Sequence, residues 1–176
     1  RVLESDPSQM DLKGDERELT VLFADVRNFT SFSEQHTPHE VVALLNEYFK
    51  IVVPTIEAAG GVVNTYLGDG VMVIFGAPEK QPDHAARAVT SAIEMVRLVH
   101  QNQHRWKDLG AGDFRIGVGV HTGNAVIGTI GSPKRLDYTA IGDTVNAAAR
   151  IEAGNKDQGT EVLISRTTHD AIDEAR

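Results

Sequence analysis

Cysteine is absent from all 176 residues of the sequence. This absence excludes disulfide bonds, zinc sites built on thiolates and a thiol nucleophile, and it fits a protein in a reducing compartment. Apolar runs are also short: none approaches the roughly 20 residues of a membrane-spanning helix, and we recognise no signal peptide. We therefore expect a cytoplasmic domain without direct membrane contact, and the full-length protein could still be anchored elsewhere.

Basic side chains are fewer than acidic ones. The chain carries 25 acidic and 17 basic side chains, which gives a net charge of -8 at pH 7. Such a balance argues against a broad nucleic-acid surface and against attraction to anionic lipid. It does not exclude a nucleotide substrate, because a divalent cation can offset the charge of the phosphates.

Apolar periodicity predicts alternating strands and helices. Residues 1–16 are polar and aperiodic and read as a linker or upstream tail, and the first residue is Arg1, so we expect a piece of a longer protein. The first predicted strand is Leu19 to Val26, and a predicted hairpin covers residues 63–76. Two further strands, 114–123 and 125–131, are predicted to meet at a turn at Thr122-Gly123-Asn124. The last two predicted strands are 136–142 and 161–165. The predicted helices are 38–59, kinked or ended at Pro54, then 82–106 and 143–154, with a short one after the last strand. The order β-α-β-β-α-β with C-terminal extras predicts an α+β, ferredoxin-like split sheet with helices on one face.

Two acids stand at matching places in this plan. Asp25 ends the first strand, and Asp69 lies in the Gly-Asp-Gly turn of the hairpin. Each has an ordinary explanation, because Asp-Gly favours tight turns and a single acid at a strand end is common. Together, on strands expected to be neighbours, they would repel each other unless a cation lies between them. The pair therefore indicates a Mg²⁺ or Mn²⁺ site and phosphoryl-transfer chemistry with two metals.

Two further groups of residues fit a phosphate ligand. The segment after Asp25 leads through Phe29 and Thr30 towards a helix N-terminus, where backbone amides can bind phosphate. Asn146 and Arg150 are four residues apart and share a helix face across three alanines. A fixed arginine stabilises charge on a transferring phosphoryl group. When this helix is considered alone, the favoured interpretation is a solvated arginine on an amphipathic helix.

Four ordered motifs, FADVRNFT, GGVVNTYLGDGVMVIFGAP, GVGVHTGNAVIG and YTAIGDTVNAAARIE, resemble the class III nucleotidyl cyclase catalytic domain over residues 17–172. The resemblance implies that Asp25, Asp69 and the Val26 carbonyl hold two Mg²⁺ or Mn²⁺ ions. It also implies in-line attack of the ribose 3′-hydroxyl on the α-phosphorus, with Asn146 orienting the ribose and Arg150 stabilising the transition state.

The family builds each site across a homodimer interface, so the resemblance implies metal acids from one chain and Asn and Arg from the other. It also implies an upstream regulatory domain. The family places a phosphate-contacting lysine on a strand beyond the arginine, and residue 176 comes before it, so we expect the last strands to be missing.

Base selection departs from the family pattern. Adenylyl cyclases carry lysine where this chain has Thr65, whereas Thr139 resembles a subgroup with threonine at the second selector position. Thr139 favours ATP and links the chain to a subgroup stimulated by bicarbonate, and Thr65 weakens the case for ATP. The expected function is an adenylyl cyclase. A guanylyl or relaxed-base cyclase and a catalytically degenerate signalling dimer remain as alternatives.

Overall fold

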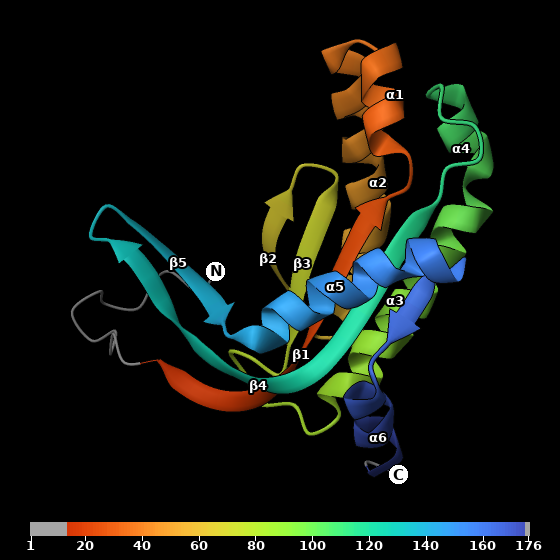
Figure 1. The fold of residues 1–176 in the computed structure, drawn as a ribbon. Helices are drawn as coiled ribbons and strands as arrows, with labels where there is room; N and C mark the ends of the chain where they lie inside the picture. The colour runs from red at the N-terminus through yellow and green to blue at the C-terminus, as the bar shows by residue number, and fades with distance from the viewer. Residues whose placement is uncertain (1–13, 175–176) are drawn as a thin grey trace.

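The computed structural model describes residues 14–174, which form six strands and six helices (Figure 1). Their order and bounds are β1 (Asp15–Val26), α1 (Phe29–Gln35), α2 (Pro38–Ala58), β2 (Val62–Leu67), β3 (Gly70–Phe75), α3 (His84–Gln101), α4 (Gln103–Asp108), β4 (Ile116–Ser132), β5 (Arg135–Ile141), α5 (Asp143–Gln158), β6 (Val162–Ile164) and α6 (Arg166–Glu174).

The strands form one sheet in the order β2-β3-β1-β4-β5, and β6 joins it parallel to β4. The other neighbouring pairs are antiparallel. The segment β1-α2-β2-β3-α3-β4 therefore has the strand order of the ferredoxin-like fold, which confirms the predicted fold class. This topology places β1 beside the β2–β3 hairpin.

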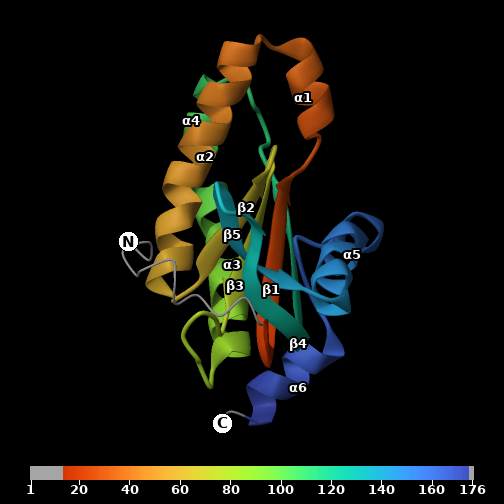
Figure 2. The same cartoon turned by 90° about the vertical axis from the view of Figure 1, so that its left-hand side faces the viewer.

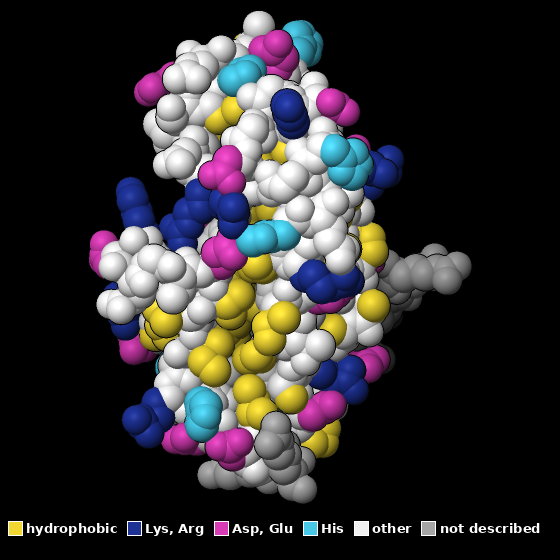
Figure 3. Space-filling model, turned by 90° about the vertical axis from the view of Figure 1, so that its right-hand side faces the viewer, with side chains coloured by type: hydrophobic (Ala, Val, Ile, Leu, Met, Phe, Trp, Pro, Cys, Tyr) yellow, Lys and Arg dark blue, Asp and Glu magenta, His cyan; other side chains and the backbone are white. Residues whose placement is uncertain are grey.

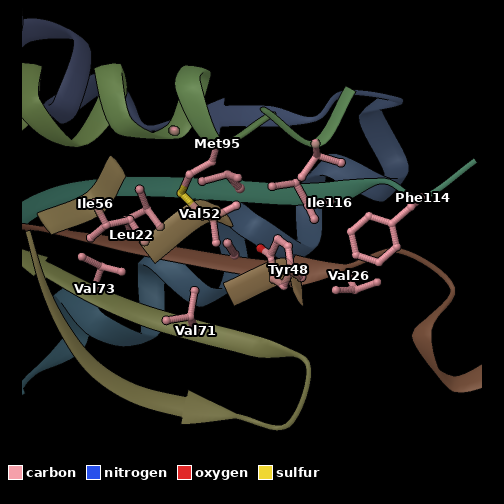
Figure 4. Close-up of a cluster of buried hydrophobic side chains, with 14 of the residues drawn as sticks. Leu22, Val26, Tyr48, Val52, Ile56, Val71, Val73, Met95, Phe114 and Ile116 are labelled. Atoms are coloured by element: carbon pink, nitrogen blue, oxygen red, sulfur yellow. The ribbon is translucent and has the colours of Figure 1, made fainter. Parts of the chain in front are cut away.

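Helices cover both faces of the sheet (Figure 2). The helices α2 and α3 lie on one face, as predicted, and enclose the main core with Leu22, Tyr48 and Met95 (Figure 4). Helix α5, one of the C-terminal extras, lies on the other face, where Ala148 packs in a second core with Leu19. The alternation of side chains along a strand lets β1 contribute to both cores. The layer formed by α5 was not assigned from the sequence.

Several predicted boundaries differ from the structure. The turn predicted at Thr122-Gly123-Asn124 is wrong, because β4 is continuous over Ile116–Ser132 and pairs with β1 along the whole of β1. Helix α2 does not end at Pro54, one of the two outcomes predicted there, and a break at Asn102 divides the predicted helix 82–106 into α3 and α4. Residues 1–13 of the predicted tail lie outside the described residues, and the strand begins earlier than predicted, at Asp15.

Large hydrophobic side chains are exposed in two regions. On α3, Ile93 is 58% exposed, and Figure 3 shows hydrophobic side chains gathered on this side of the molecule. The others, apart from Val42 on α2, lie on β2, β4 and β5: Val62, Tyr66, Leu67, Val126, Ile130, Leu136, Tyr138 and Ile141. Within residues 14–174, no helix is both long and apolar enough to span a membrane.

Glycines of β4 let α5 approach the sheet closely. A Cβ on Gly119 would lie 2.2 Å from the backbone nitrogen of Glu152, and a Cβ on Gly123 would lie 2.7 Å from the Thr144 hydroxyl. On the same helix, the Asn155 side chain donates a 2.8 Å hydrogen bond to the Val118 carbonyl. These contacts within one chain fix the position of α5, and with it the positions of Asn146 and Arg150.

We predict that Gly119→Ala lowers the free energy of unfolding by about 2 kcal/mol, because the added methyl group meets helix backbone that cannot rotate away. The matched control is Gly112→Ala, whose Cβ would have no neighbour within 4 Å. Urea denaturation of both variants measures the difference. Equal stability of Gly119→Ala and Gly112→Ala would contradict this account of α5.

Candidate active site

The structure brings Asp25 and Asp69 together. Asp25 is the penultimate residue of β1, Asp69 lies in the β2–β3 turn, and Ala24 is paired with Val71 in the adjacent strand. The Val26 amide donates a 3.2 Å hydrogen bond to Asp69 Oδ2, which ties the turn to the end of β1. Both carboxylates are partly buried at this end of the sheet.

The surroundings of Asp69 disfavour negative charge on its carboxylate. Burial raises the pKa of Asp69 above its usual range, and the negative charge of Asp25 raises it further. Backbone hydrogen bonds from Asp69 and Val26 oppose this shift in the pKa. A cation next to both acids would remove the repulsion between their carboxylates. Water reaches these carboxylates only in part, because both are partly buried.

A third acid, Glu152, lies beside the pair and was missed by the sequence prediction. It reaches from α5 across β4 and is only 8% exposed. Burial, together with the neighbouring carboxyl group of Asp25, raises the pKa of Glu152 to about 8. Periodicity gave no signal for it, because its position depends on how α5 is seated over Gly119.

Arg27 lies beside Glu152 and also points inward. Its Nη2 and the Oε1 of Glu152 are both buried and have no hydrogen-bond partner in the part of the chain that the structure describes. Both atoms lie around Gly117, 2.3 Å and 2.9 Å from the position a Cβ would take there. The absence of a side chain at Gly117 therefore makes room for these two groups.

The acidic pair fits a hard divalent cation. Carboxylate oxygens are the ligands that Mg²⁺ and Mn²⁺ prefer, and these ions commonly complete their shell with water and phosphate oxygens. Within residues 14–174, no three His, Cys, Asp or Glu side chains converge as ligands of one metal. A cation held by Asp25 and Asp69 would therefore need further oxygens from the backbone, water or a substrate.

The two residues predicted at the phosphate seat begin the short helix α1. Asn28 precedes the helix with φ of 56°, in the left-handed region, and Phe29 is the first helical residue. Phe29 packs against the main core, and Thr30 is exposed.

Asn146 and Arg150 are exposed on α5, away from the acids. The Arg150 side chain is 68% exposed, and its Nη2 lies 3.5 Å from Asp143 Oδ1. Within residues 14–174, no hydrogen bond or ion pair joins Asn146 or Arg150 to Asp25 or Asp69. One chain thus keeps the acidic pair and the Asn–Arg pair apart.

Thr65 of β2 and Thr139 of β5 lie close together, although β2 and β5 stand at the two ends of the strand order. The ribbon of β4 and β5 curves back, and β5 comes to lie near β2 (Figure 2). Both hydroxyls donate a 3.0 Å hydrogen bond to the same atom, Oδ1 of Asn64. The sequence prediction included the two threonines and missed Asn64.

Comparison with known proteins gives one consistent family. The family model described as "Adenylate and Guanylate cyclase catalytic domain" matches residues 13–176. Adenylate cyclase 1 of Rhizobium meliloti is 40% identical over 149 residues, which are 85% of this chain and 22% of that protein. An adenylate cyclase of Anabaena cylindrica is 35% identical over 152 residues, which are 86% of this chain and 30% of that protein.

Solved structures give the same result. The guanylyl cyclase Cya2 superposes with a TM-score of 0.84 at 40% identity, over 91% of this chain and 80% of that chain. The adenylyl cyclase CyaB from P. aeruginosa superposes with a TM-score of 0.83 at 33% identity, over 93% of this chain and 84% of that chain. This chain spans less than a third of the length of the two curated relatives. With the family model matched along nearly all of its length, the chain belongs to the adenylate and guanylate cyclase catalytic domain family.

Proposed function

We propose that this domain is an adenylyl cyclase that converts ATP into 3′,5′-cyclic AMP and pyrophosphate with the help of two Mg²⁺ or Mn²⁺ ions. The observation that carries the proposal is the juxtaposition of Asp25 and Asp69 at the end of β1, tied by the Val26 amide. The adenylate cyclases of Rhizobium meliloti and Anabaena cylindrica, at 40% and 35% identity, support ATP as the substrate.

In this proposal Asp25, Asp69 and the Val26 carbonyl hold the ions. When bound, the ions supply Lewis-acid chemistry: they lower the pKa of the ribose 3′-hydroxyl and neutralise the triphosphate. The 3′-hydroxyl loses its proton to solvent, the 3′-oxygen forms a bond to the α-phosphorus, the bond from the α-phosphorus to the bridging oxygen breaks, and pyrophosphate leaves. Asn146 orients the ribose, the amides of Phe29 and Thr30 contact phosphate, and Arg150 stabilises the charge on the α-phosphoryl group.

A second copy of the chain would complete each site. Arg150 is exposed and reaches only Asp143 among the acids of the described residues, so the arginine that meets the acids of one chain would come from its partner. The exposed hydrophobic side chains of β2, β4 and β5 offer a surface for that contact. A homodimer with two-fold symmetry would then carry two equivalent sites.

The proposal assigns the base of the nucleotide to Thr65 and Thr139. Their hydroxyls lie close together where β5 comes near β2, because both donate a hydrogen bond to Asn64. Regulation would come from segments outside this domain, because the curated relatives extend well beyond the part that it matches.

Asp25→Asn is expected to lower kcat by about 100-fold or more with Mn²⁺ and ATP, because one of the two metal-holding carboxylates is lost. Asp108→Asn is the matched control, since Asp108 is exposed at the end of α4. The assay measures cyclic AMP by chromatography. Near wild-type turnover of a folded Asp25→Asn variant would contradict the assigned role.

Mixing Asp25→Asn chains with Arg150→Ala chains is expected to restore about a quarter of the wild-type rate. Each homodimer is defective, whereas half of the random dimers are mixed and carry one intact site of two. Exchange of subunits is verified with two different affinity tags. No recovery in tag-verified mixed dimers would contradict a shared site.

Product analysis with Mn-ATP and Mn-GTP tests the substrate. We expect cyclic AMP as the main product, because the relatives named adenylate cyclases support ATP. Cyclic GMP as the main product would contradict this assignment. No product from either nucleotide would instead favour the degenerate signalling dimer.

A further inference from the structure

The side-chain amide of Asn64 connects β2 and β5, the strands at the two ends of the strand order. Asn64 of β2 accepts hydrogen bonds from Thr65 and from Thr139 of β5, each at 3.0 Å, on its Oδ1. Its Nδ2 donates a 2.7 Å hydrogen bond to the carbonyl oxygen of Tyr138. Asn64 therefore uses both ends of its amide to connect β2 with β5.

A β-bulge gives Asn64 this position. Val63 pairs with Val73 and Thr65 pairs with Met72, so Asn64 is the extra residue of β2 without a partner on β3. In a regular strand the side chains of residues 64 and 65 would point to opposite faces. The bulge turns them to the same region, which is what the hydrogen bond between them requires.

The contacts determine which way the amide faces. The carbonyl oxygen of Tyr138 can only accept a hydrogen bond, so the amide nitrogen of Asn64 must face it. Oδ1 then faces the two threonine hydroxyls and can only accept from them. Both hydroxyl protons are consequently used on Asn64, and each hydroxyl offers only lone pairs to any further partner.

We propose that Asn64 is a specificity-determining residue that makes Thr65 and Thr139 hydrogen-bond acceptors for the 6-amino group of adenine. This inference rests on the proposed function, in which the two threonines contact the base. A purine with hydrogen at position 6 would forgo that hydrogen bond. A purine with a carbonyl oxygen there would bring its lone pairs against those of the hydroxyls, which disfavours binding.

The test compares kcat/KM for ATP with that for purine riboside 5′-triphosphate, which lacks the 6-amino group. The wild-type domain is expected to prefer ATP by about tenfold, the effect of one net hydrogen bond. Asn64→Ala releases both hydroxyl protons, and the preference is expected to fall to about twofold or less. Asn64→Asp keeps an acceptor for the two hydroxyls and is expected to retain most of the preference.

The ratio separates this role from a structural one. Damage to the fold lowers kcat/KM for both nucleotides together and leaves their ratio unchanged, so an unchanged ratio in Asn64→Ala would overturn the proposal. Asn102→Ala is the matched control, because it removes an amide that bonds to the Leu98 carbonyl far from the threonines.

If Asn64→Ala does not fold, Thr139→Val tests the same point, and it too should lower the ratio. If the wild-type domain forms no cyclic nucleotide, the proposed function fails. If it forms cyclic AMP and the ratio does not respond, only the role of Asn64 fails.

Discussion

Repulsion between the carboxylates at the end of β1 is the constraint on which the candidate site depends. Asp25 and Asp69 face each other because β1 lies beside the β2–β3 hairpin, and the Val26 amide holds Asp69 in place. Glu152 adds a third buried acid to the same place. Folding brings these acids together at the expense of stability, because charge of one sign is partly removed from water. Such an arrangement favours a cation, and this supports the proposed metal-assisted chemistry on phosphates.

The same fold separates the two halves of the proposed chemistry. The acids lie at the end of β1, whereas the side chains of Asn146 and Arg150 on α5 are exposed to solvent and form no hydrogen bond or ion pair with them in the part of the chain that the structure describes. In the proposed homodimer, a two-fold partner would bring the arginine of one chain to the carboxylates of the other.

Much of this could be predicted from local patterns. The runs around Asp25 and Asp69 predicted two neighbouring strands, and the sheet order places the acids together. The turn predicted within β4 was wrong because glycines in a strand imitate a turn signal, and only the pairing with β1 shows that the strand continues. Glu152 and Asn64 could not be found in this way. The position of Glu152 follows from helix seating over Gly119, and that of Asn64 from a bulge and from the curvature that brings β5 to β2.

The most direct measurement is anomalous diffraction from a crystal of the domain soaked with Mn²⁺ and a non-hydrolysable ATP analogue. The account predicts manganese peaks within coordination distance of carboxylate oxygens of both Asp25 and Asp69, with the triphosphate bound to the same ions. Manganese bound only elsewhere, or nucleotide bound with no ion at this pair of acids, would contradict the central claim.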